Sequence, residues 1–165
     1  MKTLILDNRQ IQEKIKRLAF QVYEENYTET EIVLAGIAPN GYHIARQIAS
    51  LLIEISPIQV HLIQLIVNKE NPLQSQIQSD KSESFHLDNL TVIVIDDVLN
   101  TGKTMIYGIN YLLAYPLKKV QTLVLIDRDH KQFPVLAHYI GMALSTNLQE
   151  HVTVILNEEM AVYLE

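Results

Sequence analysis

A length of 165 residues fits one compact domain and is short for two. Because 48% of the residues are hydrophobic and only 19% are charged, the composition excludes a chain that is disordered throughout and a collagen-like or coiled-coil fibre. The lack of cysteine excludes disulfides, iron–sulfur clusters and thiolate zinc sites, and the net charge of −6 works against nonspecific binding to nucleic acid.

Strand and helix patterns alternate along the chain. Short apolar runs predict strands at residues 3–6, 31–37, 58–67, 91–95, 120–126 and 152–156. Apolar residues at helical spacing predict helices over residues 11–22, 44–52 and 103–114, and Asp7 or Asn8 can cap the first of them.

This alternation predicts one α/β domain over residues 1–165. We expect a three-layer parallel sheet with right-handed crossovers, whose ligands bind beyond the carboxyl ends of the strands. Residues 68–89 are polar, with few large apolar side chains. A loop of this length in a compact domain is usually functional, and we interpret it as a flexible lid.

The sequence gives no sign of a membrane or a metal centre. No apolar run approaches the roughly 18 residues of a membrane-spanning helix. Asp7, Asn8 and Arg9 interrupt the start of the chain before a signal-peptide core could form. We therefore expect a cytoplasmic protein without a membrane partner. The six histidines lack metal-site spacing, so we assign no direct metal ligand in the protein.

The most informative segment runs from Val92 to Thr104 and reads VIVIDDVLNTGKT. Four apolar residues deliver the adjacent carboxylates of Asp96 and Asp97 to the end of a buried strand, and Thr-Gly-Lys-Thr then opens a helix. The free N–H groups and positive dipole end of a helix start can hold a phosphate, and Gly102 lets the backbone approach it closely. The segment predicts carboxylates beside a bound phosphate.

Two other interpretations explain this segment less well. Gly102-Lys103-Thr104 matches the end of a Walker A loop, but the first glycine of that motif would fall at Asp97. A carboxylate there would face phosphate oxygens that backbone amides should bind. Solvated carboxylates at a plain strand end would leave the following Thr-Gly-Lys-Thr without an explanation.

The same residues resemble the signature of the type I phosphoribosyltransferases, which is four apolar residues, two acids, three variable positions and [TS]-G-x-T. The likeness is greatest to members that combine uracil phosphoribosyl transfer with attenuation of a pyrimidine operon, and it covers nearly the whole chain. Its further support is Ile5-Leu6-Asp7, Leu125-Ile126-Asp127-Arg128, Pro134 and Tyr139-Ile140-Gly141.

The resemblance implies that phosphoribosyl pyrophosphate and a nucleobase are the substrates, with Mg²⁺ bound mainly through the pyrophosphate donor. Asp96 and Asp97 would be the catalytic pair, holding the ribose hydroxyls and stabilising positive charge on the ring. The residues implied to hold the 5-phosphate are Val98, Leu99, Asn100, Thr101, Gly102, Lys103 and Thr104.

Ala38, Pro39, Asn40 and Gly41 occupy the position of the family's pyrophosphate loop, although Pro and Gly also suit an ordinary strand-to-helix turn. The close relatives carry Thr-Arg-Gly in place of Pro-Asn-Gly, so a guanidinium that could bind pyrophosphate is missing. In the lid, Lys69 is the nearest substitute for a second arginine of the relatives, and it lacks the fork geometry.

A small hood, formed by about residues 1–10 and 127–165, is implied to cover the base. The residues implied to contact the nucleobase are Asp127, Arg128, Tyr139 and Ile140. Packing in the core would explain Tyr139 equally well. Asn100 stands where purine-specific members commonly have an aspartate, and an asparagine cannot accept a proton at neutral pH. This favours a pyrimidine over a purine, or weak catalysis, and the resemblance implies that the base is uracil.

Two alternatives to this enzyme stay open. One is an RNA-binding pyrimidine-operon regulator, which we disfavour because Leu136, Met142 and Asn147 stand where the relatives' RNA face would need basic or hydroxyl groups. The other is a nucleotide-sensing pseudoenzyme, which the missing arginines suggest. The resemblance also implies a homodimer, for which the tyrosines at 107, 111 and 115 offer a candidate surface.

Overall fold

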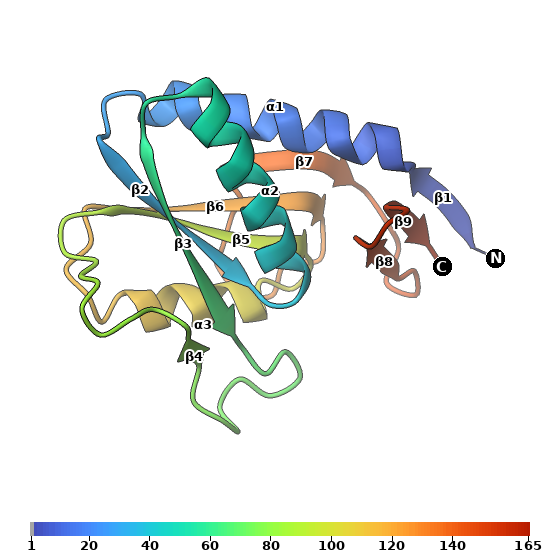
Figure 1. Ribbon diagram of the computed structural model, residues 1–165. Coiled ribbons are helices and arrows are strands. Elements are labelled where there is room, and N and C mark those ends of the chain that lie inside the picture. The colour runs from blue at the N-terminus through green and yellow to red at the C-terminus, as the bar shows by residue number, and fades with distance from the viewer. Residues whose placement is uncertain (1) are drawn as a thin grey trace.

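The computed structural model describes residues 2–165 and shows a central six-stranded sheet with helices on both faces (Figure 1). The strands of this sheet are β2 (Glu31–Ile37), β3 (Gln59–Ile66), β4 (Gln78–Ser79), β5 (Thr91–Leu99), β6 (Lys119–Arg128) and β7 (Tyr139–Leu144). They lie in the order β4-β3-β2-β5-β6-β7, and β4 alone among these is antiparallel to its neighbour. The helices are α1 (Asn8–Asn26), α2 (Asn40–Ile55) and α3 (Lys103–Leu112).

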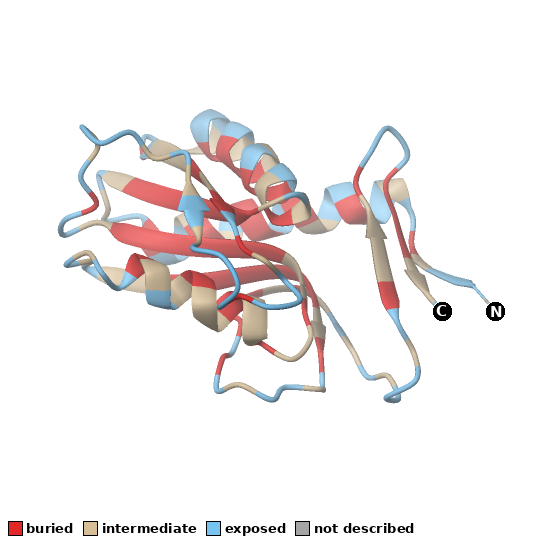
Figure 2. Ribbon diagram, turned by 90° about the horizontal axis from the view of Figure 1, so that it is seen from below, coloured by how far each residue is buried: buried red, intermediate tan, exposed pale blue. Residues whose placement is uncertain are grey.

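The three layers that the sequence predicts are confirmed. Helices α1 and α2 cover one face of the sheet and α3 covers the other (Figure 1). The central strands are buried on both faces, as the continuous burial of β2 and β5 shows (Figure 2). This explains why these strands read as unbroken apolar runs rather than as alternating patterns. The sheet is therefore a rigid frame for side chains at its carboxyl edge.

Helix α1 begins where the sequence predicts. The Asp7 carboxylate accepts the Gln10 N–H at 2.8 Å, and the Gln10 side chain accepts the Asp7 N–H at 3.0 Å, so the two form a capping box. Ile11, Ile15 and Leu18 then bury one face of the helix against the sheet. Within residues 2–165, none of the helices combines the length and apolar character needed to cross a bilayer.

A second, three-stranded sheet forms the hood. Its strands are β1 (Thr3–Leu6), β8 (Val152–Ile155) and β9 (Ala161–Leu164), in the antiparallel order β1-β9-β8. It stands at the end of the main sheet toward which β7 points (Figure 1). The assignment of all of residues 127–165 to the hood is wrong for Tyr139–Leu144, because these residues pair in parallel with β6 as the edge of the main sheet.

The predicted lid is partly ordered by the core. Its short strand β4 pairs with the end of β3, at Leu65–Ser79 and Ile66–Gln78. Leu87 is fully buried on the α3 face of the sheet, and Ile77 and Phe85 pack against the same cluster. Residues 68–76, which precede β4, contain no helix or strand. The part of the lid segment from Ile77 onward is thus anchored to the core. The part before it lies at the carboxyl edge of the sheet, where Lys69 contacts Asp96.

Candidate active site

The site lies between β2 and β5, where the direction of the sheet connections changes. From β2 the chain crosses to β3 on one side, whereas from β5 it crosses to β6 and β7 on the other. Open α/β sheets bind ligands beyond the strand ends at such a switch point. The pairing of β2 with β5 ends at Gly36 and Ile95, but β5 continues beside β6 to Leu99. The acidic pair therefore lies on a stretch of β5 with a strand neighbour on one side only. The strand itself ends at Leu99, four residues beyond the predicted end at Ile95.

The start of α2 occupies the open side of this stretch. A Cβ atom on Gly41 would lie 2.3 Å from the carbonyl oxygen of Ile95 and 2.9 Å from Cα of Asp96, which is too close for any other residue. Glycine at this position allows the predicted pyrophosphate loop to lie directly against the acidic pair.

Few backbone donors of the pyrophosphate loop are available to a ligand. Ala38 donates its N–H to the carbonyl of Leu65 at 2.8 Å, and Pro39 has no N–H to donate. The donors that remain are the N–H groups of Asn40 and Gly41, in the first turn of α2, where no intrahelical partner exists. This part of the loop can offer an anion two amides and the positive end of a helix dipole.

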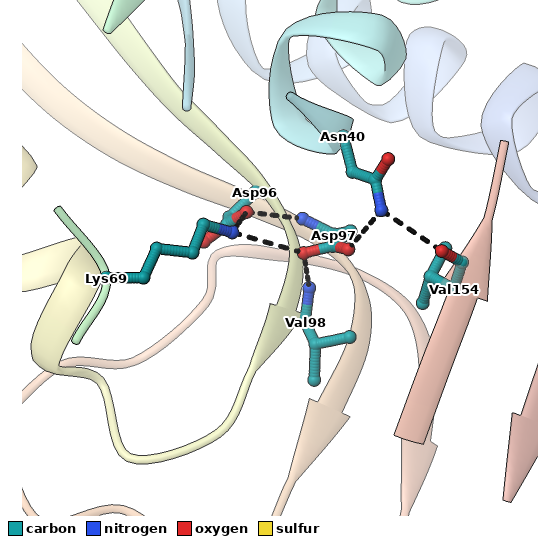
Figure 3. Close-up of polar contacts among 6 residues, drawn as sticks. All are labelled: Asn40, Lys69, Asp96, Asp97, Val98 and Val154. Carbon is teal, nitrogen blue, oxygen red and sulfur yellow. Dashed lines mark hydrogen bonds and ion pairs between the residues drawn. The ribbon is translucent and has the colours of Figure 1, made fainter. Parts of the chain in front are cut away.

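Asp96 and Asp97 are held by donors from three parts of the chain (Figure 3). Lys69 Nζ lies 3.2 Å from Asp96 Oδ1 and 3.8 Å from Asp97 Oδ1. The N–H groups of Asp97 and Val98 donate to Asp96 Oδ1 and Asp97 Oδ1, each at 2.9 Å. Asn40 Nδ2 donates to Asp97 Oδ2 at 2.7 Å. The predicted lid residue, the predicted loop residue and both predicted carboxylates thus form one cluster.

The two carboxylates differ in their electrostatics. Burial, together with the charge of Asp97, raises the pKa of Asp96 to about 8, and the positive charge of Lys69 only partly opposes this. Burial works against the Lys69 ammonium, but the carboxylates of Asp96 and Asp97 outweigh it and raise the Lys69 pKa. The site can therefore hold a proton on Asp96 near neutral pH while Lys69 stays charged.

The predicted phosphate loop contains a left-handed residue just before α3. Gly102 has φ +83°, a conformation that favours glycine, and α3 begins at the next residue. The carbonyl of Thr101 accepts the N–H groups of Gln132 and Phe133 at 2.9 and 3.0 Å, which fixes the loop from the outside. The first N–H groups of α3 then point away from the helix without intrahelical partners. Such a loop can hold a phosphate at the dipole end of α3.

Val98 and Leu99 do not present their side chains to this loop. Both lie within β5, paired with Ile126 and Asp127 of β6. Leu99 is buried on the α3 face, and Val98 packs against the opposite core. Their implied contact with phosphate is corrected for this reason: the loop that can reach a phosphate begins at Asn100.

Asp127 and Arg128 lie at the end of β6, beside the hood, but both are engaged. Asp127 forms an ion pair with Lys131. The Arg128 guanidinium, in a residue 4% exposed, donates to Thr146 Oγ1 at 2.7 and 3.0 Å and to the carbonyl of Glu150 at 2.9 Å. Arg128 therefore shapes the loop between β7 and β8 and has little surface to offer a base directly.

Tyr139 and Ile140, the other two residues implied to contact the base, pack within the protein. Tyr139 is 2% exposed at the start of β7, and its hydroxyl donates to Gln121 Oε1 at 2.9 Å and contacts the side chains of Asn26 and Glu25. Burial and the neighbouring Glu25 carboxylate raise the pKa of this phenol. Ile140 packs on the α3 face. These contacts favour core packing for Tyr139 over contact with a base.

A cavity of about 450 Å³ lies between the predicted phosphate loop and the loops that follow β6 and β7. Asn100 and Thr101 line one side of it, and Arg128 and Lys131 line another. The sequence analysis missed the remaining lining residues, which are His130, Gln132, Leu148, Glu150 and His151. They lie in loops after β6 and β7, and no local pattern marks them because only the fold brings the loops together.

The fold and the site define a type I phosphoribosyltransferase. The sequence matches the family model of the phosphoribosyl transferase domain over residues 2–158. The chain belongs to this family and is a phosphoribosyltransferase.

Its relatives include several proteins named bifunctional protein PyrR. The one from Fusobacterium nucleatum subsp. nucleatum is 32% identical over 161 residues, which cover 94% of this chain and 91% of the relative. The one from Bacillus pumilus is 32% identical over 165 residues, with 95% and 92% covered. The one from Haemophilus ducreyi is 29% identical over 164 residues, with 93% and 89% covered.

Solved structures share the fold at lower identity. The hypoxanthine phosphoribosyltransferase of Trypanosoma cruzi superposes with a TM-score of 0.76 at 13% identity, covering 97% of this chain and 95% of the other. A hypoxanthine-guanine phosphoribosyltransferase from Bacillus anthracis gives a TM-score of 0.70 at 20% identity, with 86% and 83% covered. At these identities the likeness concerns the fold alone.

Proposed function

We propose that the protein transfers a 5-phosphoribosyl group from phosphoribosyl pyrophosphate to uracil and releases pyrophosphate. The observation that carries the proposal is the position of Asp96 and Asp97 at the switch point, between the start of α2 and the loop that opens α3. The positive dipole end of α2 could hold the pyrophosphate of this substrate, and that of α3 its 5-phosphate. The carboxylates lie between them, where the ribose would be.

The arrangement suits a displacement at the anomeric carbon. As the bond from this carbon to the pyrophosphate oxygen breaks and the bond to the base nitrogen forms, positive charge develops on the ribose ring. Fixed carboxylates in a largely buried site stabilise such charge. Asp96 and Asp97 would hold the ribose hydroxyls, residues Asn100 to Thr104 the 5-phosphate, and the amides of Asn40 and Gly41 the pyrophosphate.

The protein's own residues fit a Mg²⁺ ion that is bound mainly through the substrate. Across residues 2–165, no group of three or more His, Cys, Asp or Glu side chains is arranged to hold a metal. Mg²⁺ commonly takes one or two carboxylates and completes its shell with phosphate oxygens and water. Asp96 and Asp97 can supply carboxylate oxygens, and the ion would neutralise charge on the leaving pyrophosphate.

We place the base in the cavity between the phosphate loop and the hood. This cavity adjoins the proposed ribose position through Asn100 and Thr101, so a base there could reach the anomeric carbon. Asn100 offers an amide rather than a carboxylate to the base, which supports a pyrimidine over a purine that needs a proton acceptor. Uracil is the acceptor that this chemistry and the PyrR-like sequence favour.

Pyrophosphate release tests the proposal. The purified protein would be supplied with phosphoribosyl pyrophosphate, Mg²⁺ and one base at a time, namely uracil, hypoxanthine or guanine. We expect release with uracil, and a decrease of roughly 100-fold in the Asp97→Asn variant because a preorganised charge is lost. Release with a purine alone would contradict the base assignment. Binding of ribose 5-phosphate without release for any base would indicate the nucleotide-sensing pseudoenzyme.

RNA binding is the second candidate function, and the charges near the hood weigh against it. Lys131 is paired with Asp127 and donates to the carbonyl of Arg128 at 2.8 Å. The Arg128 guanidinium is engaged within the protein as well. Neither group is free to release counterions from a phosphate backbone. A mobility-shift titration at low salt tests this, and tight, salt-dependent binding of pyrimidine-operon leader RNA would reverse the order of the two functions.

For the assembly we propose a homodimer on the basis of the family resemblance. The row of tyrosines offers weaker support than the sequence suggests, because Tyr111 and Tyr115 pack partly against the α3-face core. Tyr107 and Tyr111 also line a cavity of about 360 Å³ together with Pro72 and Leu73 of the lid segment. Sedimentation velocity gives the mass in solution, and a monomer at assay concentration would contradict the proposal.

A further inference from the structure

One side chain, Asn40, connects the three parts of the molecule that meet at the site (Figure 3). Its Nδ2 atom donates to Asp97 Oδ2 at 2.7 Å and to the carbonyl of Val154 at 3.1 Å. Asn40 begins α2, Asp97 lies on β5, and Val154 lies on β8 of the hood. An amide nitrogen carries two hydrogens, so these two bonds use its whole donor capacity.

The partners also determine which way the amide points. Exchanging its nitrogen and oxygen would place Oδ1 against a carboxylate oxygen and a carbonyl oxygen, and neither can donate. The polar atom left over is therefore an acceptor. An acceptor cannot bind a pyrophosphate oxygen, so this side chain does not replace the guanidinium that the relatives carry in the loop.

On Asp97 the two oxygens receive donors from different elements. Oδ1 accepts the Val98 N–H at 2.9 Å and lies 3.8 Å from Lys69 Nζ. Among residues 2–165, the side chain of Asn40 is the sole donor to Oδ2. Bonds to a charged acceptor are strong and directional, so Asn40 fixes the plane of this carboxylate. The oxygen that faces the ribose is set by that plane.

On the hood, Asn40 contacts the edge strand β8. β8 is an edge strand of its sheet, with β9 as its strand neighbour. The apolar residues Val152 and Leu156 pack against the core at its two ends. The bond to Val154 supplies a polar tie between them. Through Asn40, the position of β8 is linked to the orientation of the Asp97 carboxylate. In the proposed function, the hood would lie near the base and this carboxylate near the ribose.

We infer that the Asn40 side chain has a positioning role in phosphoribosyl transfer: it orients Asp97 and ties the hood to the carboxyl end of the sheet, and only the backbone N–H of Asn40 is left to bind the pyrophosphate. The catalytic part of this inference rests on the proposed function. What it adds is the role of the Asn40 side chain and the link between the hood and Asp97. The hood tie alone can be tested without any substrate.

A binding cycle tests the action of Asn40 through Asp97. Calorimetry would measure ribose 5-phosphate, and separately inorganic pyrophosphate with Mg²⁺, for Asn40→Ala and for the isosteric Asn40→Asp. We expect about tenfold weaker ribose 5-phosphate binding in both variants, as for a lost bond to a charged group. Pyrophosphate binding should be unchanged in Asn40→Ala, which adds no charge to the loop. In an Asp97→Ala background, Asn40→Ala should change the affinity less than about twofold. A steady-state assay should show a lower kcat with a smaller change in the KM for pyrophosphate donor.

The matched control is Gln47→Ala. Gln47 lies on the same helix and contacts the hood at Met160 Sδ, 3.8 Å away, without touching the acidic pair. Its ribose 5-phosphate affinity should stay within about twofold of the unsubstituted chain. The inference is overturned if Asn40→Ala weakens pyrophosphate binding instead, or if it weakens ribose 5-phosphate equally with and without Asp97.

Hydrogen exchange of the ligand-free protein tests the hood tie. Loss of the bond to Val154 should speed the amide exchange of residues 152–155 by about tenfold in both Asn40 variants, whereas α1 should be unaffected. Unchanged exchange in both variants overturns the tie. If the unsubstituted chain binds no ribose 5-phosphate at all, the proposed function fails, and this exchange measurement still decides the inference about the hood.

Discussion

Lys69 Nζ lies 3.2 Å from Oδ1 of Asp96, a residue that is only 3% exposed. The lid segment thus brings a cation to the acidic pair of the ligand-free site. A carboxylate so deeply buried is costly to ionise unless a positive charge lies near it. Under the proposed function, a ribose that binds to this pair would compete with the ammonium for the same carboxylates, and we expect substrate binding to affect the position of Lys69.

The first prediction concerns this charge pair. Replacing Lys69 with Met removes the positive charge that lowers the pKa of Asp96, so the pKa should rise further above about 8. A carboxyl-carbon NMR titration measures it directly. Lys81→Met is the control, because Lys81 lies in the same segment but donates to the carbonyl of Phe85 at 2.8 Å, away from the acidic pair. An unchanged Asp96 titration in Lys69→Met would contradict the pairing.

The second prediction is a pH dependence of stability. The pKa of Asp96 rises from 3.8 to about 8 on folding, so the folded chain binds more protons than the unfolded chain between these values. Its free energy of unfolding should therefore fall as the pH rises through this window. Asp96→Asn removes the carboxylate that is costly to ionise in the folded chain. The variant should therefore be more stable than the unsubstituted chain by on the order of 1–3 kcal/mol at about pH 9, with a smaller difference at about pH 4.

Urea denaturation at several pH values measures this difference. Asp88→Asn is the matched control, since Asp88 is exposed and makes no side-chain hydrogen bond or ion pair within residues 2–165. Its stability should follow the unsubstituted chain at every pH. If Asp96→Asn were less stable at high pH, the carboxylate would be stabilised in the fold rather than strained by burial.

Much of the fold and part of the site follow from local sequence. The buried strands appear in the sequence as short apolar runs and the helices as apolar residues at helical spacing, and the motif around Asp96 marks the strand end and the helix start that follow it. The sequence predicts the strand end at Ile95 because the apolar run stops there and two acidic residues follow. In the structure β6 continues to pair with β5 past them, a long-range contact that the local pattern does not contain.

The errors have the same origin. β7 contains Gly141 and lies between loops, so its pairing with β6 depends on contacts from a distant segment. Its first residue, Tyr139, reads equally as a base-stacking or a core residue, because a tyrosine suits both. The role of Asn40 is also invisible in sequence, since its partners Asp97 and Val154 are 57 and 114 residues away.

The third prediction separates the two readings of Tyr139. Tyr139→Phe removes a buried hydroxyl that donates to Gln121 Oε1 and accepts from Asn26 Nδ2, so unfolding should need about 1–3 kcal/mol less free energy. The KM for the nucleobase should not change. Tyr163→Phe, on the hood strand β9, should leave stability within about 0.5 kcal/mol, because its ring rather than its hydroxyl contacts Lys2. Thermal denaturation and steady-state kinetics measure both. A raised KM with unchanged stability would restore the base-binding role.

The last prediction compares two glycines that lie in helices. An alanine Cβ at Gly41 would collide with the carbonyl oxygen of Ile95 and with Cα of Asp96. Both are backbone atoms of β5, which cannot move aside as a side chain could. The start of α2 would have to move away from β5, so Gly41→Ala should cost about 1–3 kcal/mol of stability and displace Asn40 from Asp97.

At Gly108, within α3, the nearest atom to an added Cβ is Ile37 Cδ1 at 3.5 Å, an ordinary contact. Gly108→Ala should therefore gain about 0.5–1 kcal/mol from the better helix propensity of alanine. Urea midpoints of the two variants should move in opposite directions from the unsubstituted chain. Both substitutions add the same methyl group to a helix. A similar loss of stability in both variants would therefore contradict the prediction that the close approach of α2 to β5 makes Gly41→Ala destabilising.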